Sequence, residues 1–266
     1  MYFKELISVT RGLKILIVSL AVTLALNLIV HQGAKTVDDL ALVKVNVGSG
    51  PSVATATATT ADDRVPLSLL FAIAGVIATI FAGAYGSSLA GENRGHLELA
   101  WTKPASRDRY ALVTMGIDLI AIEAAFGITL AFAVAVLAGT GHLQQIVADP
   151  HLGINLVRFM LLPIAFYGLW QALTASLRSQ AALVIGCSVL VCAFLLGLQA
   201  MLHGEPWHTL IRSVNFLNPL VYGTYQSGAT TIQYPFATWE FNLAALALIG
   251  AAGAVLALAQ WRRVEA

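Results

Sequence analysis

Six long apolar stretches constrain this chain more than any other feature of its sequence. A helix needs about 20 apolar residues to cross the ~30 Å hydrocarbon core of a bilayer, and each stretch is close to that length. An isolated strand would leave its backbone groups unpaired in lipid, so all six are predicted to be helices. The predicted spans are residues 15–30, 66–90, 110–138, 156–177, 181–202 and 239–259. We therefore predict an all-α, polytopic membrane protein in which residues 1–266 form a single transmembrane domain.

Composition agrees with lipid as the solvent for most of the surface. Hydrophobic residues make up 58% of the chain and charged residues 11%, with a mean hydropathy of +0.78. Soluble domains carry about 25% charged residues. A net charge of +1 excludes a broad basic surface for nucleic acid. Cys187 and Cys192 share one apolar run, which favours buried small hydrophobic residues over a disulfide or a metal pair.

Lysine and arginine predict the orientation of the spans. Ten of the 15 fall in the connections on one side, and five fall on the other: Lys35, Lys44, Arg64, Arg158 and Arg212. By the positive-inside rule we expect a multi-pass membrane protein with both termini cytoplasmic. Residues 2–9 form a short amphipathic helix in the cytoplasmic interface or, alternatively, a frayed tail. The first span is expected to be retained and not cleaved as a signal peptide.

The two outer loops differ in character. Residues 31–65 are polar and contain a low-complexity Ala/Thr run, to which we assign no chemistry. Residues 203–238 carry many aromatic side chains among Pro, Gly and Asn. So aromatic a loop is expected to pack onto the outer face of the bundle or to enter the membrane interface.

The most informative segment is the cytoplasmic loop 91–109, between the second and third spans. Its first part, Glu92 to Trp101, can form a short amphipathic helix, with Leu97 and Trp101 on one face. Lys103-Pro104 then ends that helix, because the residue before a proline is pushed out of helical geometry. A short charged helix joined to a membrane helix at each end suits the transmission of force from a soluble partner.

This loop resembles the cytoplasmic loop of the type-2 ATP-binding-cassette (ABC) exporter permeases over about 16 residues. That family often shows an acidic residue, Gly, Leu-Glu and then Ser/Thr-Lys-Pro-x-Ser-Arg. The matching positions here are Glu92, Gly95, Leu97-Glu98, Thr102-Lys103-Pro104 and Ser106-Arg107. The six spans, the amphipathic N-terminal helix and the hydrophobic outer loop extend the likeness over nearly the whole chain. The pair Asn218-Pro219 adds a weaker signal.

The resemblance implies a permease subunit that works by alternating access with a separate cytoplasmic ATPase. A second permease subunit, identical or different, would complete the path for an unidentified, amphipathic or lipid-like substrate. The resemblance carries over six residues as the ATPase interface: Glu92, Gly95, Glu98, Lys103, Pro104 and Arg107. ATP and Mg would bind the partner, since this chain has no Gly-Lys-Ser/Thr sequence. The alternative is a loop whose charges only enforce topology.

Asp118 and Glu123 are ionisable residues within the third span. Such groups should face the bundle or a wet cavity, lining a substrate path or joining helices. Five residues place them ~140° apart around the helix, so we expect two separate positions. The candidate partners are Arg178, Asn27, Gln171 and Gln180. Small residues four apart, Ala82 with Gly86 and Gly250 with Ala254, carry little weight because Ala and Gly are so common here.

Two other function classes remain open. A lipid-modifying enzyme or protease within the membrane would need convergent acids, histidines or a metal motif. The six histidines lie outside the middles of the spans, so we predict neither a metal site nor catalytic residues. A non-catalytic subunit that anchors a larger complex is the remaining alternative. Turnover without an ATPase would favour the enzyme, and co-purification with a non-ATPase complex would favour the anchor.

Overall fold

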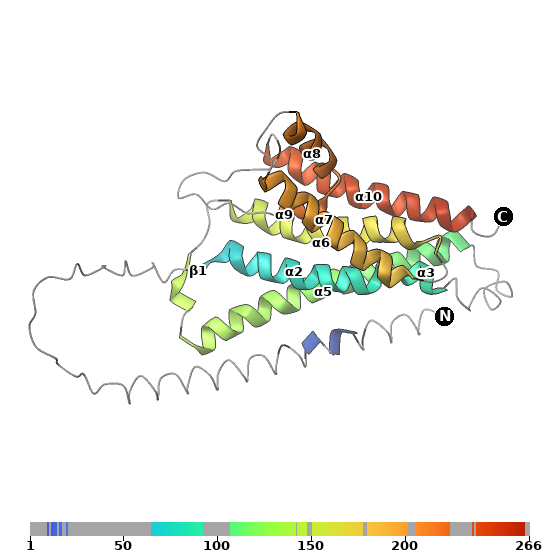
Figure 1. The fold of residues 1–266 in the computed structure, drawn as a ribbon. Helices are drawn as coiled ribbons and strands as arrows, with labels where there is room; N and C mark the ends of the chain where they lie inside the picture. The colour runs from blue at the N-terminus through green and yellow to red at the C-terminus, as the bar shows by residue number, and fades with distance from the viewer. Residues whose placement is uncertain are drawn as a thin grey trace, which may run out of the picture.

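The computed structural model describes residues 10, 12–14, 16–17, 20, 65–92, 107–141, 143–147, 151–177, 180–201, 206–223, 236 and 238–263. Their architecture is a helical bundle (Figure 1). Its main helices are α2 (Leu67–Tyr85), α3 (Ser88–Glu92), α5 (Arg107–Gly139), α6 (Leu152–Thr174), α7 (Ala181–Met201) and α10 (Trp239–Arg263). Five helices, one of them α2 continued through α3, are long and apolar enough to cross a membrane.

These five helices coincide with five of the six predicted spans. The helices extend further than the apolar runs: α5 begins at Arg107, α6 at Leu152, and α10 continues to Arg263. Hydropathy marks the part of a helix that suits lipid, whereas the backbone hydrogen bonds continue into the polar ends. Most of the first predicted span lies outside the described residues, as do residues 2–9, 31–64 and 93–106.

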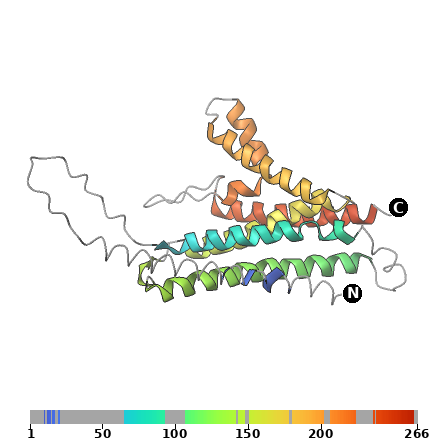
Figure 2. The same cartoon turned by 60° about the horizontal axis from the view of Figure 1, so that its bottom comes forward.

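Helix α6 lies at the centre of the bundle, between α10 and α2, and α5 packs on the other side of α2 (Figures 1 and 2). Phe159, Phe166 and Trp170 of α6 are nearly fully buried and belong to one hydrophobic core. Helix α7 has far fewer contacts, and in Figure 2 it diverges from the other helices toward α8. The bundle therefore has a packed core around α6 and a peripheral helix, α7.

Glycines allow α6 and α10 to approach unusually closely. A Cβ added to Gly168 would lie 2.8 Å from Cα of Gly250, and one added to Gly253 would lie 2.9 Å from the backbone N of Leu169. At Gly86 an added Cβ would lie 2.8 Å from Cβ of Trp170. The sequence interpretation, which gave little importance to the small residues Gly86 and Gly250, was therefore wrong, because both lie at close helix contacts.

Short elements at the two ends complete the fold. Strands β1 (Val65–Pro66) and β2 (Ile146–Val147) pair in parallel, with the 3-10 turn η1 (Leu143–Gln145) directly before β2. This strand pair of two residues each was not anticipated in the all-α prediction. It joins the start of α2 to the connection that follows α5.

The described part of the aromatic loop packs onto the bundle only in part: its second short helix contacts α6, whereas its first contacts the peripheral α7 and leaves Trp207 62% exposed. The loop forms α8 (Trp207–Asn215) and α9 (Pro219–Gly223), and the ring of Phe236 lies beside that of Tyr222. The Nδ2 of Asn218 donates to the Cys192 carbonyl of α7 at 2.9 Å, and its Oδ1 accepts from the Leu220 N–H at 3.1 Å. Asn218 thus joins α9 to α7.

The cysteine prediction holds only in part. Both thiols are free and Cys192 is buried, but Cys187 is exposed on the outer surface of α7. Because α7 is peripheral, an apolar run there does not imply burial within the protein.

Candidate functional site

A break in α2 organises the polar interior of the bundle. The span predicted over 66–90 is one apolar run, yet its helix stops at Tyr85, turns at Gly86 and Ser87, and resumes as α3 at Ser88. Gly86 packs so tightly against Trp170 of α6 that a side chain does not fit without movement. The break lies near the end of the bundle from which residues 93–106 connect α3 to α5.

Side chains of α6 satisfy the backbone carbonyls at this break. The amide Nε2 of Gln171 donates to the Tyr85 carbonyl at 3.0 Å. The hydroxyl of Thr174 lies 2.7 Å from the Gly86 carbonyl and 2.8 Å from the Trp170 carbonyl of its own helix. A carbonyl without a donor in an apolar bundle costs several kcal/mol, on the order of the water-to-alkane transfer penalty. These two side chains therefore stabilise an interruption that lipid alone would not tolerate.

Asp118 of α5 joins the same cluster. It is 1% exposed, and one of its oxygens, Oδ2, accepts from the hydroxyl of Ser88 at 2.7 Å and from that of Tyr167 at 2.8 Å. The Nε2 of Gln171 in turn lies 2.8 Å from Ser88 Oγ and 3.1 Å from Tyr167 Oη. One carboxylate, two hydroxyls and one amide thus connect α3, α5 and α6.

The two hydroxyl donors of this cluster, Ser88 and Tyr167, both point toward Asp118. A carbonyl can only accept, so the Gln171 group that faces Tyr85 is its NH₂. The two NH₂ protons are shared among the Tyr85 carbonyl and the Ser88 and Tyr167 oxygens, and both hydroxyls donate their own protons to Asp118. Two hydrogen bonds donated to one oxygen stabilise the ionised carboxylate. The cluster is thus suited to hold a buried negative charge and to fix the position of α3.

The partner predictions for Asp118 are partly met. Gln171 belongs to its cluster, although it bonds to Ser88 and Tyr167 and not to Asp118 itself. The prediction of Gln180 as a partner is wrong, because Gln180 is exposed directly before α7. Asn27 and Arg178 lie outside the described residues. Sequence reasoning missed Ser88, Tyr167 and Thr174. The signal was present, since Tyr167, Gln171 and Thr174 recur at i, i+4 and i+7, which is one face of a helix.

Glu123 lies one and a half turns further along α5, on a different face. Its side chain is partly buried, and in the part of the chain described here neither carboxylate oxygen accepts a hydrogen bond. It takes no part in the cluster around Asp118.

Of the predicted ATPase-interface residues, Glu92 ends α3 and Arg107 begins α5. Gly95, Glu98, Lys103 and Pro104 lie outside the described residues. At the same end of the bundle, Arg262 donates to both oxygens of Asp108, at 3.0 and 2.7 Å. This pair joins the end of α10 to the start of α5. It is solvent-exposed, so water and salt screen it and its contribution to stability is small.

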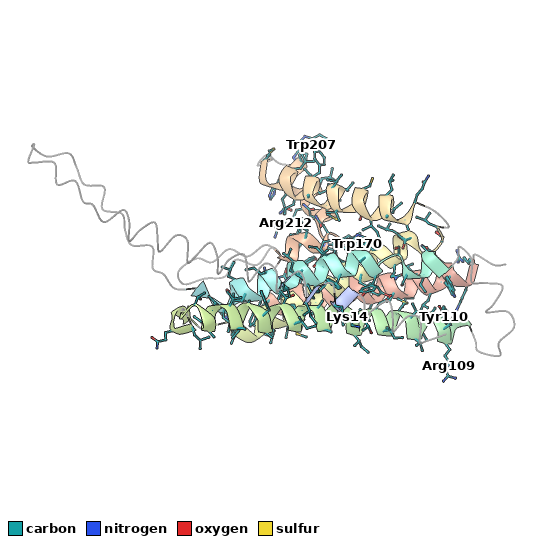
Figure 3. All side chains as sticks on the ribbon, turned by 90° about the horizontal axis from the view of Figure 1, so that it is seen from below. Lys14, Arg109, Tyr110, Trp170, Trp207 and Arg212 are labelled. Carbon is teal, nitrogen blue, oxygen red and sulfur yellow. The ribbon has the colours of Figure 1, made fainter. Side chains whose placement is uncertain are left out.

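The position of Arg158 changes the count of lysine and arginine residues on which the predicted orientation rests. Arg158 was assigned to an outer loop, but it lies within α6 and is 2% exposed, with its guanidinium carbon 5.1 Å from the centre of the Phe159 ring. The error arose because a charge near the end of an apolar run was read as part of the connection. Arg158 is therefore a buried cation of the bundle, and it is removed from the set of loop charges used to predict the orientation. Figure 3 shows Arg109 and Tyr110, near the start of α5, toward the end of the bundle away from Trp207 and Arg212.

No family model, curated protein or solved structure matches this chain. Function must therefore be argued from the residues. Among the described residues, no group of three His, Cys, Asp or Glu side chains could hold a metal ion. Ser88 contacts a carboxylate directly, with no described histidine between them to act as a base, so the cluster does not have the geometry of a nucleophilic active site. What it can do is bind one helix segment firmly to two others.

Proposed function

We propose that this chain is the membrane subunit of an ABC-type exporter, driven by a separate cytoplasmic ATPase. The observation that carries the proposal is the likeness of residues 92–107 to the cytoplasmic loop of type-2 exporter permeases. The fold supports it, because that loop joins two membrane-length helices, α2–α3 and α5, on the same end of the bundle. The orientation with this end in the cytoplasm, six spans and the bacterial inner membrane belong to the proposal.

The mechanism would follow from the position of the loop. ATP and Mg bound by the partner would close the ATPase subunits, and the ATPase would move residues 92–107. Since Glu92 is the last residue of α3 and Arg107 the first of α5, displacement of the loop acts directly on both helices. Alternating access then requires a second permease subunit, so that two bundles enclose the path for an amphipathic or lipid-like substrate.

Co-purification tests the proposal without knowledge of the substrate. The tagged chain, purified in mild detergent from its native membrane, should retain a nucleotide-hydrolysing subunit in stoichiometric amount. The charge reversals Glu98→Lys and Arg107→Glu together should remove that subunit. The matched control is Glu240→Lys with Arg212→Glu, which makes the same charge change at exposed positions on the other end of the bundle. Retention of the ATPase by the first variant, or loss from both variants alike, would contradict the proposed interface.

A further inference from the structure

The cluster around Asp118 holds α3 independently of the connection that follows it. Four side chains carry this contact, which we name the α3 latch: Ser88, Asp118, Tyr167 and Gln171. Leu89 and Ala90 of α3 are also buried against the bundle. Four residues after Leu89 the chain enters the segment 93–106. The latch and these two buried residues are therefore the described contacts that hold α3 before the proposed ATPase contact.

The break before α3 gives the latch a mechanical consequence. A continuous helix would transmit a displacement of its end along its whole length. Here the backbone ladder is interrupted at Gly86 and Ser87, and hydrogen bonds from α6 replace it. A displacement of α3 is therefore passed to α6 directly through Gln171, which contacts Ser88, and indirectly through Asp118 of α5 to Tyr167. Helices α3 and α5 both adjoin the moving segment in the sequence, whereas α6 does not.

We propose that Gln171 and Tyr167 are positioning residues that transmit movement of α3 to α6, with the turn at Gly86 and Ser87 as the hinge. This inference rests on the proposed function for the origin of the movement. Helix α6 is not adjacent to residues 93–106 in the sequence. It lies between α2 and α10, where it contacts most of the bundle. Movement of α6 would thus convert a local displacement at the loop into a rearrangement of the core.

Spin labels on the two sides of the latch test this inference. In a background with Cys187→Ser and Cys192→Ala, one label is placed at Ser87→Cys in the hinge. A second is placed separately at Val157→Cys, which is 43% exposed near the other end of α6. The complex with its ATPase is trapped with Mg·ATP and orthovanadate. In the otherwise unchanged protein the spectra of both labels should change on trapping.

The latch variants should separate these two responses. With Gln171→Leu or Tyr167→Phe, the label at residue 87 should still respond and the response at residue 157 should be lost. Two variants of Thr174 test the hinge beside the latch. Thr174→Val removes the hydroxyl that donates to the Gly86 carbonyl, and the response at residue 157 should be lost. Thr174→Ser keeps a hydroxyl at this position, and the response should be retained. A response at 157 that survives in all latch variants would overturn the inference. No response at either label in the unmodified complex would instead count against the proposed function.

Discussion

The closest helix contact in the bundle yields a prediction that does not depend on function. At Gly168 the backbones of α6 and α10 meet with no side chain between them, since an added Cβ would lie 2.8 Å from Cα of Gly250. Ordinary contact between two carbon atoms is about 3.5–4.0 Å. Gly168→Ala must therefore separate the two helices by several tenths of an ångström, and neither backbone can rotate away as a flexible side chain would.

Two opposing terms set the magnitude. Alanine is favoured over glycine in a helix interior by about 1 kcal/mol. Overpacking a close contact costs about 1–3 kcal/mol, and the upper part of this range applies when backbone must move. The expected result for Gly168→Ala is a net destabilisation of ~1–2 kcal/mol. Gly116→Ala and Gly197→Ala are matched controls, because nothing lies within 4 Å of a Cβ added at either position. They should be neutral or slightly stabilising.

Thermal exposure of a buried thiol measures this difference. With Cys187→Ser, the buried Cys192 is the one remaining cysteine, and a thiol-reactive dye reports its exposure on heating. The unfolding midpoint of Gly168→Ala should fall below that of the parent, while the midpoints of Gly116→Ala and Gly197→Ala should not. If Gly168→Ala matched the two controls, the close crossing of α6 and α10 would be refuted.

Three further predictions concern the ends of the bundle. Asn218→Ala removes the donor to the buried Oδ1 of Asn215 and a second donor to the Cys192 carbonyl, and it should lower stability by about 1–3 kcal/mol in the same thiol assay, whereas the exposed Ser213→Ala should stay within about 0.5 kcal/mol of the parent. Burial raises the pKa of Tyr222 in α9 to about 12 from its usual value of 10.0, so its contribution to stability is full below pH 10 and is lost as the pH rises through about 12. Absorbance titration of tyrosinate, with Tyr222→Phe as the reference, checks this, and ionisation of Tyr222 near pH 10 in the folded protein would contradict it. Arg262→Ala should shift the unfolding midpoint far less than Asn218→Ala, and less still at high salt, because its pair with Asp108 is exposed; a shift as large as that of Asn218→Ala would contradict this.

Hydropathy predicted the helices well and their interruptions poorly. Apolar length is a property of a whole stretch, and lipid requires that such a stretch be helical, so five spans lie where they were expected. The break at Gly86 depends on donors from Gln171 and Thr174, which lie more than 80 positions away in the sequence. No local pattern in residues 66–90 contains that information.

The same distinction explains the polar residues. Depth in the membrane predicted that Asp118 would be buried, but only the packing of α6 against α3 and α5 shows that Ser88 and Tyr167 are its donors. Arg158 was misplaced for the opposite reason: its position near the end of the predicted span 156–177 favoured solvent, and the packing around α6 buries it in the bundle instead.

The buried polar residues of α6 lie at its two ends, and this distribution bears on how the helix can move. Asn155 and Arg158 are buried near its start, and Gln171 and Thr174 near its end. Between them, the contact at Gly168 brings the α6 and α10 backbones together. Backbone contact is less compliant than contact between flexible side chains, because no rotamer change can absorb a shift. A displacement applied at Gln171, one turn from Gly168, would therefore move α10 together with α6, unless the two helices separate at their closest point.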